Sequence, residues 1–281
     1  MKEINFQVRY ASHPSDVKTY DTDQLRSHFL VSNIFETNQI NMVYSEYDRF
    51  IVGGAFPVDE KLSLEPIDPL KSSYFLERRE LGIVNVGGTA VVTVDNTDYE
   101  LKYKEALYVG KGVKSVLFAS KDKKSGSKLY LNSSTAHTAY PTKKVSLSDA
   151  IKVELGSLEQ SNARVINKLI VNDILPTCQL QMGLTEFLPG SVWNTMPAHT
   201  HGRRMETYFY FELEKGQSIC HFMGQPQETR HIFLKNNEAV ISPTWSIHAG
   251  VGTSKYAFIW GMAGENLDYG DMDIVQPDEL R

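Results

Sequence analysis

The sequence predicts an all-β chain built as two barrels, and three observations lead to this prediction. Short runs rich in Val, Ile, Tyr and Phe recur along the 281 residues and are separated by Gly, Asn, Asp and Pro, which is the pattern of short strands in a sandwich or a barrel. Long stretches with helical periodicity are scarce. The two halves also resemble each other weakly, which favours two moderate cores over one large core.

The predicted strands follow one another through both halves of the chain, each bounded by turn-forming residues. In order they are Met42–Tyr44, Leu81–Val86, Ala90–Val94, Ala106–Val109, Val116–Ala119, Leu129–Leu131, Met205–Phe211, Arg230–Leu234, Glu238–Ile241 and Tyr256–Trp260. Helices are expected only in two short pieces, over Thr22–Leu30 with Thr22 or Asp23 as the N-cap, and around Ser146–Lys152.

A weak internal repeat supports the division into two barrels. Arg78-Arg79 is echoed by Arg203-Arg204 at an offset of about 125 residues, and Glu105-Ala-Leu by Glu238-Ala-Val at about 133. The polar segment Ala136–Ala163 between them is the predicted linker. We therefore expect an N-terminal barrel over residues 1–150 and a C-terminal barrel over residues 151–281.

Composition excludes several classes of function. The chain carries 29 basic and 34 acidic residues, a net charge of −5, and no run of Lys or Arg that could follow a phosphate backbone, so nucleic acid is not an expected partner. Its two cysteines, Cys178 and Cys220, are far apart, which excludes a disulfide framework. No apolar stretch approaches the ~20 residues of a membrane span. A cytoplasmic protein without a membrane partner is expected.

Four residues in the C-terminal half have the types and spacing of a metal site. His199 and His201 are two residues apart, so on a strand both imidazoles point to the same side. Glu206 follows at an odd separation, which requires a turn or bulge at Gly202-Arg203-Arg204 before the strand Met205–Phe211. His248 follows the strand that starts at Glu238 and a turn containing Pro, so it arrives from a different strand.

The residue types indicate a divalent cation but leave its identity open. Neutral imidazoles with one carboxylate suit zinc, iron, manganese or nickel. Projected through the repeat, the four positions fall on Tyr74, Leu76, Leu81 and Ser115, none of which is a good ligand. The N-terminal barrel is therefore expected to lack a metal site and to serve as scaffold or assembly surface.

The pattern of two histidines, a glutamate and a distant histidine resembles that of the bicupins, with departures. Trp193 stands where a glycine usually precedes the first histidine by six positions, and Pro243-Thr-Trp245 replaces the usual Pro-x-Gly. The chain is more similar to the 5-keto-4-deoxyuronate isomerase family of pectin breakdown, a bicupin family. The stretches that carry this resemblance span nearly the whole chain: Ser73–Gly82, Ala106–Gly112, Ala136–Val145, Trp193–His201, Met223–His231 and Ile241–His248.

The resemblance implies a fold, a cofactor and a reaction. It implies two cupin-type barrels with a few short helices, one Zn²⁺ per subunit held by His199, His201, Glu206 and His248, and a homohexamer. The implied reaction is the interconversion of 5-dehydro-4-deoxy-D-glucuronate and 3-deoxy-D-glycero-2,5-hexodiulosonate. A metal-dependent oxygenase and a non-catalytic sugar-binding cupin are the alternatives.

Five further residues are candidates for contact with a uronate substrate. Arg203 and Arg230 lie near predicted barrel mouths, as does Arg204 beside Arg203, and these arginines could pair with its carboxylate. Tyr208 shares strand parity with Glu206, and Trp245 precedes His248 closely, so either could line the pocket. The sequence assigns no general base, although Glu206 is conceivable in that role.

Overall fold

The computed structural model describes residues 4–265, 267–268 and 270–281, and they form two compact units. Unit 1 contains residues 4–9, 33–150 and 168–182. Unit 2 contains residues 10–32, 151–167 and 183–281. The chain passes between the units inside two strands, β14 and β15. Each unit thus includes a segment from outside the range predicted for its barrel, and the boundaries 1–150 and 151–281 stay a prediction.

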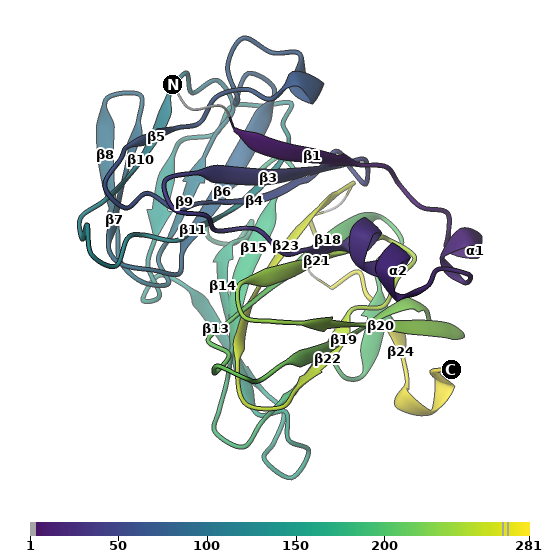
Figure 1. Ribbon diagram of the computed structural model, residues 1–281. Coiled ribbons are helices and arrows are strands. Elements are labelled where there is room, and N and C mark those ends of the chain that lie inside the picture. The colour runs from purple at the N-terminus through teal and green to yellow at the C-terminus, as the bar shows by residue number, and fades with distance from the viewer. Residues whose placement is uncertain (1–3, 266, 269) are drawn as a thin grey trace. The chain divides into compact units, whose positions relative to one another are not determined.

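Unit 1 consists of two sheets around an apolar core (Figure 1). The first sheet has the order β1 (Asn5–Arg9), β3 (Ile40–Ser45), β4 (Ile51–Ala55), β11 (Leu129–Thr135), β6 (Arg79–Asn85), β9 (Ala106–Val109) and β12 (Lys143–Val145). The second has the order β5 (Leu62–Ser63), β10 (Val116–Ser120), β7 (Ala90–Val94) and β8 (Thr97–Leu101). A 3₁₀ helix, η1, spans Asp68–Leu70. Side chains such as Leu81, Val92 and Phe118 are fully buried in the core.

Unit 2 repeats this arrangement and adds a small third sheet. Its large sheet has the order β13 (Ile151–Leu155), β14 (Arg164–Ile170), β15 (Gln181–Phe187), β23 (Ala257–Gly264), β18 (Arg204–Phe211), β21 (Glu238–Ser242) and β2 (Leu30–Val31). The second sheet has the order β16 (Trp193–Asn194), β22 (Ala249–Gly252), β19 (Ile219–Gln225) and β20 (Glu228–Leu234). The third pairs β17 (Ala198–Thr200) with β24 (Asp273–Val275).

The strand orders of the two units correspond one to one. In the large sheets β6 lies between β11 and β9, and β18 lies between β23 and β21. In the small sheets the hairpin β7–β8 occupies the place of β19–β20. The topology therefore contains the same unit twice, in line with the weak repeat of the sequence. The all-β class with few helices is confirmed.

The helices correct two local predictions. α1 spans Pro14–Val17, α2 spans Thr22–Phe29, and the 3₁₀ helix η2 spans Pro277–Glu279. Asp21, not Thr22 or Asp23, caps α2, because its carboxylate accepts the Gln24 N–H at 2.8 Å while Gln24 accepts from the Asp21 backbone. α2 packs beside β20 and β21 (Figure 1).

The helix expected around Ser146–Lys152 is absent there. The Asp149 carboxylate accepts hydrogen bonds from the backbone N–H and the hydroxyl of Ser146, at 2.9 and 2.6 Å, which holds a turn. Such side-chain contacts compete with helix formation. Strand β13 then begins at Ile151, so the segment predicted as a linker contains β12 and β13.

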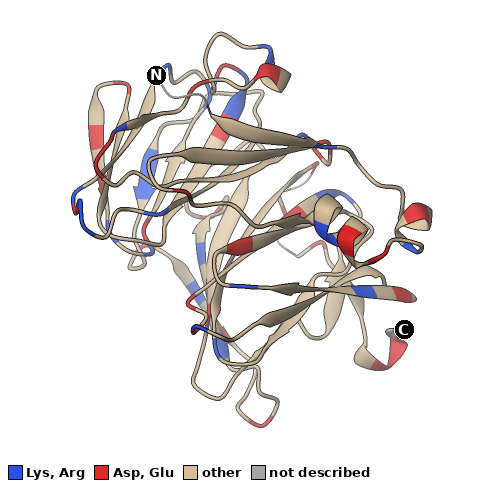
Figure 2. Ribbon diagram, viewed as in Figure 1, with Lys and Arg blue, Asp and Glu red and all other residues tan. Residues whose placement is uncertain are grey.

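Charged residues occur throughout both units. Figure 2 shows acidic and basic residues intermixed over strands and loops. None of the described helices has the length and apolar character that a membrane crossing requires. Cys178 and Cys220 are both free thiols.

Candidate metal centre

Three segments of unit 2 bring the four predicted ligands together. β17 places His199 and His201 two residues apart. The chain then turns, and β18 restarts at Arg204, so that Glu206 points back toward the histidines. His248 lies between β21 and β22, directly before β22. The register change predicted at residues 202–204 is therefore present.

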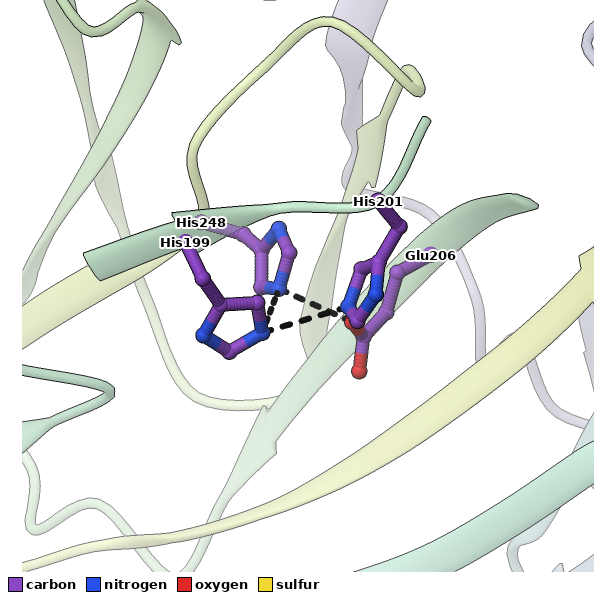
Figure 3. A group of neighbouring side chains, drawn as sticks. All are labelled: His199, His201, Glu206 and His248. Atoms are coloured by element: carbon purple, nitrogen blue, oxygen red, sulfur yellow. Dashed lines mark hydrogen bonds and ion pairs between the residues drawn. The ribbon is translucent and has the colours of Figure 1, made fainter. Parts of the chain in front are cut away.

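The ligand atoms form a tight group (Figure 3). The Nε2 atom of His199 lies 3.1 Å from that of His201 and 2.9 Å from that of His248. The Oε2 atom of Glu206 lies 3.1 Å from His201 Nε2 and 2.9 Å from His248 Nε2. All four ligand atoms lie within 4.8 Å of one another.

Hydrogen bonds alone do not account for this group. A neutral imidazole has one N–H, and three Nε2 atoms here converge with a carboxylate that only accepts. His199 Nε2 faces two other ring nitrogens at hydrogen-bond distance. Two donor atoms that each lie ~2.0–2.1 Å from the same cation, on neighbouring coordination positions, are about 3 Å apart. The donor set and its spacing therefore fit a shared divalent cation.

The surroundings of His199 and Glu206 favour the protonation states that a cation needs. Burial, with His248 nearby, lowers the pKa of His199 to about 2, so its imidazole is neutral at physiological pH. Burial raises the pKa of Glu206, but His248 and His201 outweigh this effect, and its pKa lies below the ordinary value. The carboxylate is therefore ionised. His201, Glu206 and His248 are 3%, 5% and 1% exposed.

A second set of contacts orients the ligands. Asp271 Oδ1 lies 3.5 Å from His201 Nδ1 and 2.5 Å from Arg204 Nη2. Ser242 Oγ lies 3.5 Å from His248 Nδ1. An imidazole that binds a cation through Nε2 carries its proton on Nδ1, where an oxygen acceptor fixes the ring. Ser242 is placed for this role beside His248, and Asp271 beside His201, whose Nδ1 also lies 3.4 Å from Arg204 Nε.

A deeper polar layer lies inside the barrel behind the ligands. The Tyr210 hydroxyl lies 2.7 Å from His221 Nδ1, and Asn194 donates to the Tyr256 hydroxyl at 2.6 Å. Burial lowers the pKa of His221 to about 3, so this histidine is neutral. A side chain at Gly250 would place Cβ 2.9 Å from Asn194 Nδ2, so this layer needs the glycine. His221 serves packing and hydrogen bonding there.

Three of the four ligands border a cavity of about 240 Å³ within unit 2. His199, His201 and Glu206 contribute to its wall, and most of the rest is apolar. The hydroxyl of Tyr208, also in the wall, lies 2.8 Å from Thr195 Oγ1. The remaining lining residues are Leu155, Arg164, Ile166, Thr185, Met196, Pro197, Arg204, Phe258, Trp260, Met262, Met272 and Ile274.

Of the five residues predicted to contact a substrate, only Arg204 and Tyr208 line this cavity. The Arg203 side chain is 67% exposed and pairs with Glu265 at 3.6 Å. Arg230 pairs with Glu228 at 2.8 Å and donates to the Lys18 carbonyl. Trp245 packs edge-on against Phe29 at 6.3 Å. The last three side chains are thus engaged elsewhere in unit 2.

Two polar residues at the site, Arg164 and Asp271, were missed by the sequence reasoning. Arg164 lines the cavity, and Asp271 contacts both His201 and Arg204. Arg204, which the sequence places near a barrel mouth, also lines the cavity and is 1% exposed although it stands beside the exposed Arg203. It lies two residues before Glu206 and therefore shares its strand parity. No local sequence pattern marks Asp271 as a site residue.

A single group with metal-ligand geometry is present in the described part of the chain. It belongs to unit 2. The described residues of unit 1 form no such group.

Comparison with known proteins identifies relatives over nearly the whole chain. The model of the KduI/IolB family matches residues 30–276. A relative from Formosa agariphila, named 4-deoxy-L-threo-5-hexosulose-uronate ketol-isomerase, is 61% identical over 276 residues, which cover 98% of this chain and 99% of the relative.

Solved structures of low sequence identity share the fold. An IolB-like protein from Salmonella typhimurium LT2 aligns with a TM-score of 0.69 at 15% identity, covering 88% of this chain and 96% of the other. Oxalate decarboxylase from Lactobacillus farciminis aligns with a TM-score of 0.61 at 11% identity, covering 94% and 91%. The predicted class of two cupin-type barrels is thereby confirmed.

Proposed function

The chain belongs to the KduI/IolB family and is an isomerase, and from this premise we propose that it interconverts 5-dehydro-4-deoxy-D-glucuronate and 3-deoxy-D-glycero-2,5-hexodiulosonate with a bound divalent metal ion. The observation that carries the metal dependence is the convergence of three Nε2 atoms and one carboxylate oxygen on one point beside a cavity. The name of the 61% identical relative supports the substrate class. This is the substrate of uronate and pectin degradation that the sequence resemblance implies.

His199, His201, Glu206 and His248 would hold the ion, and we propose zinc, one per chain. The donor set suits zinc among other borderline divalent ions, and the family resemblance favours it. When bound there, the ion supplies Lewis-acid stabilisation of the negative charge that develops on substrate oxygens.

The reaction is balanced without an external oxidant or reductant. One hydrogen leaves the carbon that bears the hydroxyl group, and one is added to the neighbouring carbonyl carbon. The hydroxyl proton moves to the former carbonyl oxygen. The substrate and the product are therefore isomers.

The chain's own side chains would bind and orient the substrate in the unit 2 cavity. Arg164 and Arg204 give the wall two guanidinium groups that suit the substrate carboxylate. Tyr208, held by Thr195, presents a hydroxyl that can hydrogen-bond a sugar oxygen. The apolar remainder of the wall excludes water and strengthens these contacts. We propose Arg164 and Arg204 in place of Arg203 and Arg230, because only the former pair reaches the cavity.

We also propose a homohexamer that works in the cytoplasm, with the catalytic site in the C-terminal half, residues 151–281. The resemblance of the sequence to its family is the support for the assembly. Free thiols at Cys178 and Cys220 are compatible with a reducing compartment. Light scattering should give six times the chain mass of 31.8 kDa.

A substrate assay with oxygen monitoring tests the proposed reaction against an oxygenase. The purified protein, loaded with zinc, should convert 5-dehydro-4-deoxy-D-glucuronate to an isomer of unchanged mass. NMR should detect this product, and no oxygen should be consumed. Oxygen consumption or a product of altered mass would replace the isomerase by the oxygenase. Binding of the uronate without any conversion would instead identify a non-catalytic sugar-binding protein.

A further inference from the structure

Unit 1 contains a second cavity, of about 170 Å³, lined by three arginines. Arg49 lies in the turn between β3 and β4, and Arg78 and Arg79 lie at the start of β6. The wall also includes Tyr44, Ser72 and Phe75. The cavity is smaller than the ~300–1,000 Å³ of typical drug-sized ligand sites, but it has room for more than a single ion.

The charges around this cavity are unbalanced. Arg78 pairs with Glu77 at 3.5 Å. Arg79 is 4% exposed and bonds only neutral oxygens in the described chain, namely Ser133 Oγ at 3.0 Å, the Ser133 carbonyl at 2.8 Å and the Arg49 carbonyl at 2.6 Å. Arg49 has no ion pair with a described residue. Buried or clustered cations are normally paired, so the cavity presents positive charge in a chain of net charge −5.

Electrostatics and hydrogen bonding point to the same missing partner. Burial lowers the pKa of Arg79 to about 10; Arg49 acts in the same direction, Tyr44 and Glu80 act in the opposite one, and Arg79 is still cationic at neutral pH. The Ser72 hydroxyl is buried without a hydrogen-bond partner among the described residues. An anion in the cavity would relieve the repulsion between the guanidinium groups and accept a hydrogen bond from Ser72.

An arginine of this cavity also corresponds, in the repeated topology, to an arginine of the metal cavity in unit 2. Arg79 is the first residue of β6, and Arg204, which lines the metal cavity of unit 2, is the first residue of β18. β6 and β18 are corresponding strands of the two large sheets. Unit 1 thus keeps a buried arginine at the start of the corresponding strand. The four positions of unit 1 that correspond to the metal ligands are not part of a metal-binding group.

From these observations we propose that unit 1 carries a metal-free binding site for a small organic anion, with Arg49, Arg79 and Ser72 as its binding groups. The ligand class is a small molecule with a carboxylate or phosphate group. Arg78, tied to Glu77 and to the Lys71 carbonyl at 2.6 Å, borders the entrance. The proposal does not depend on the reaction proposed for unit 2.

Isothermal titration of the intact protein at low salt tests this site, with inorganic phosphate and D-glucuronate as the two probes. Arg49→Gln removes an exposed guanidinium that supports no packing. It should weaken binding of the preferred probe by at least about tenfold, since a charged hydrogen bond is lost. Lys61→Gln makes the same charge change on an exposed side chain of unit 1 outside the cavity and should leave binding unchanged. Isomerase turnover should be unaffected in both variants.

Ser72→Ala is a second, milder variant, which should also weaken binding while the chain stays folded. The probe that responds to Arg49→Gln identifies the site as one for phosphate or for carboxylate. Binding of both probes with wild-type affinity in Arg49→Gln and Ser72→Ala would overturn the proposal. Absence of binding to the wild-type protein at millimolar concentrations of either probe would overturn it as well.

Discussion

At the scale of single residues, the proposed activity depends on four ligand side chains and on the groups that orient them. The spacing of His199, His201 and Glu206 could be interpreted from the sequence because it is local, and strand parity fixes which side chains share a face. The contribution of Asp271 could not, because 65 residues of chain separate it from Glu206 and only tertiary structure brings it near.

Substitution of His248 by Ala should remove the metal and the activity together. The change takes away one of four donors and leaves a space in a buried site. Elemental analysis should find metal content reduced severalfold, and turnover should fall by at least about a thousandfold if the ion stabilises the developing charge. His231→Ala is the control, because His231 is exposed on β20 and outside the group. Full turnover in His248→Ala with circular dichroism unchanged would disprove the metal mechanism.

Asp271→Asn tests the orienting contact of His201. The neutral amide can still occupy the space, but it is a weaker acceptor for His201 Nδ1–H and loses the charge that pairs with Arg204. Changes of this kind commonly cost 10- to 100-fold in metal affinity. A competition titration with a chelator should show a loss in this range, and Asp278→Asn, in the exposed η2 turn, should show none. Equal metal affinity in both variants would exclude the contact from metal binding.

At the scale of elements, strands with a strong apolar pattern were predicted well and elements defined by distant partners were not. β18, β21 and β23 overlap their predicted ranges because each has a run of β-branched and aromatic residues. β24 pairs with β17 far upstream in the chain, and its three residues have no strand signal of their own. The prediction of a helix around Ser146–Lys152 was wrong because the hydrogen bonds between Asp149 and Ser146 stabilise a turn there instead.

Removal of β24 should open the metal cavity. Met272 and Ile274 line the cavity, and Ile274 is in register with His199. A chain that ends at Gly270 loses these walls and also Asp271. Its turnover should fall at least about tenfold, and its ions should exchange faster with a fluorescent chelator. The single change Asp278→Asn, an exposed position near the same terminus and outside the cavity lining, is the control. Wild-type turnover in the shortened chain would show that the segment has no part in the site.

At the scale of the whole molecule, the same topology occurs twice, with a group of metal-ligand geometry in unit 2 and an arginine-lined cavity in unit 1. The corresponding strand orders explain why a weak repeat could be detected in the sequence. Residues 10–32 belong to unit 2 and residues 168–182 belong to unit 1. This assignment could not be predicted, since no local sequence pattern shows with which unit a segment packs.

Acid should destabilise the metal-free protein. The pKa of His221 is about 3 in the folded chain against an ordinary value of 6.5, so between these values the unfolded chain binds the extra proton. The free energy of unfolding is therefore highest above pH 6.5 and should fall by about 1.4 kcal/mol per pH unit for this histidine as the pH decreases. The lowered pKa of His199 acts in the same direction. Urea denaturation between pH 7 and pH 4 measures the slope.

His221→Gln should reduce this slope, because it removes one titrating group and keeps a polar side chain near the Tyr210 hydroxyl. An unchanged slope in the variant would mean that His221 is protonated in the folded protein.

Stepwise reconstitution of the metal-stripped protein with zinc tests the central claim most directly. Turnover of the uronate should be absent in the stripped protein, rise linearly with added zinc and level off at one ion per chain, as four converging donors in one unit require. Full turnover before any zinc is added would contradict the account.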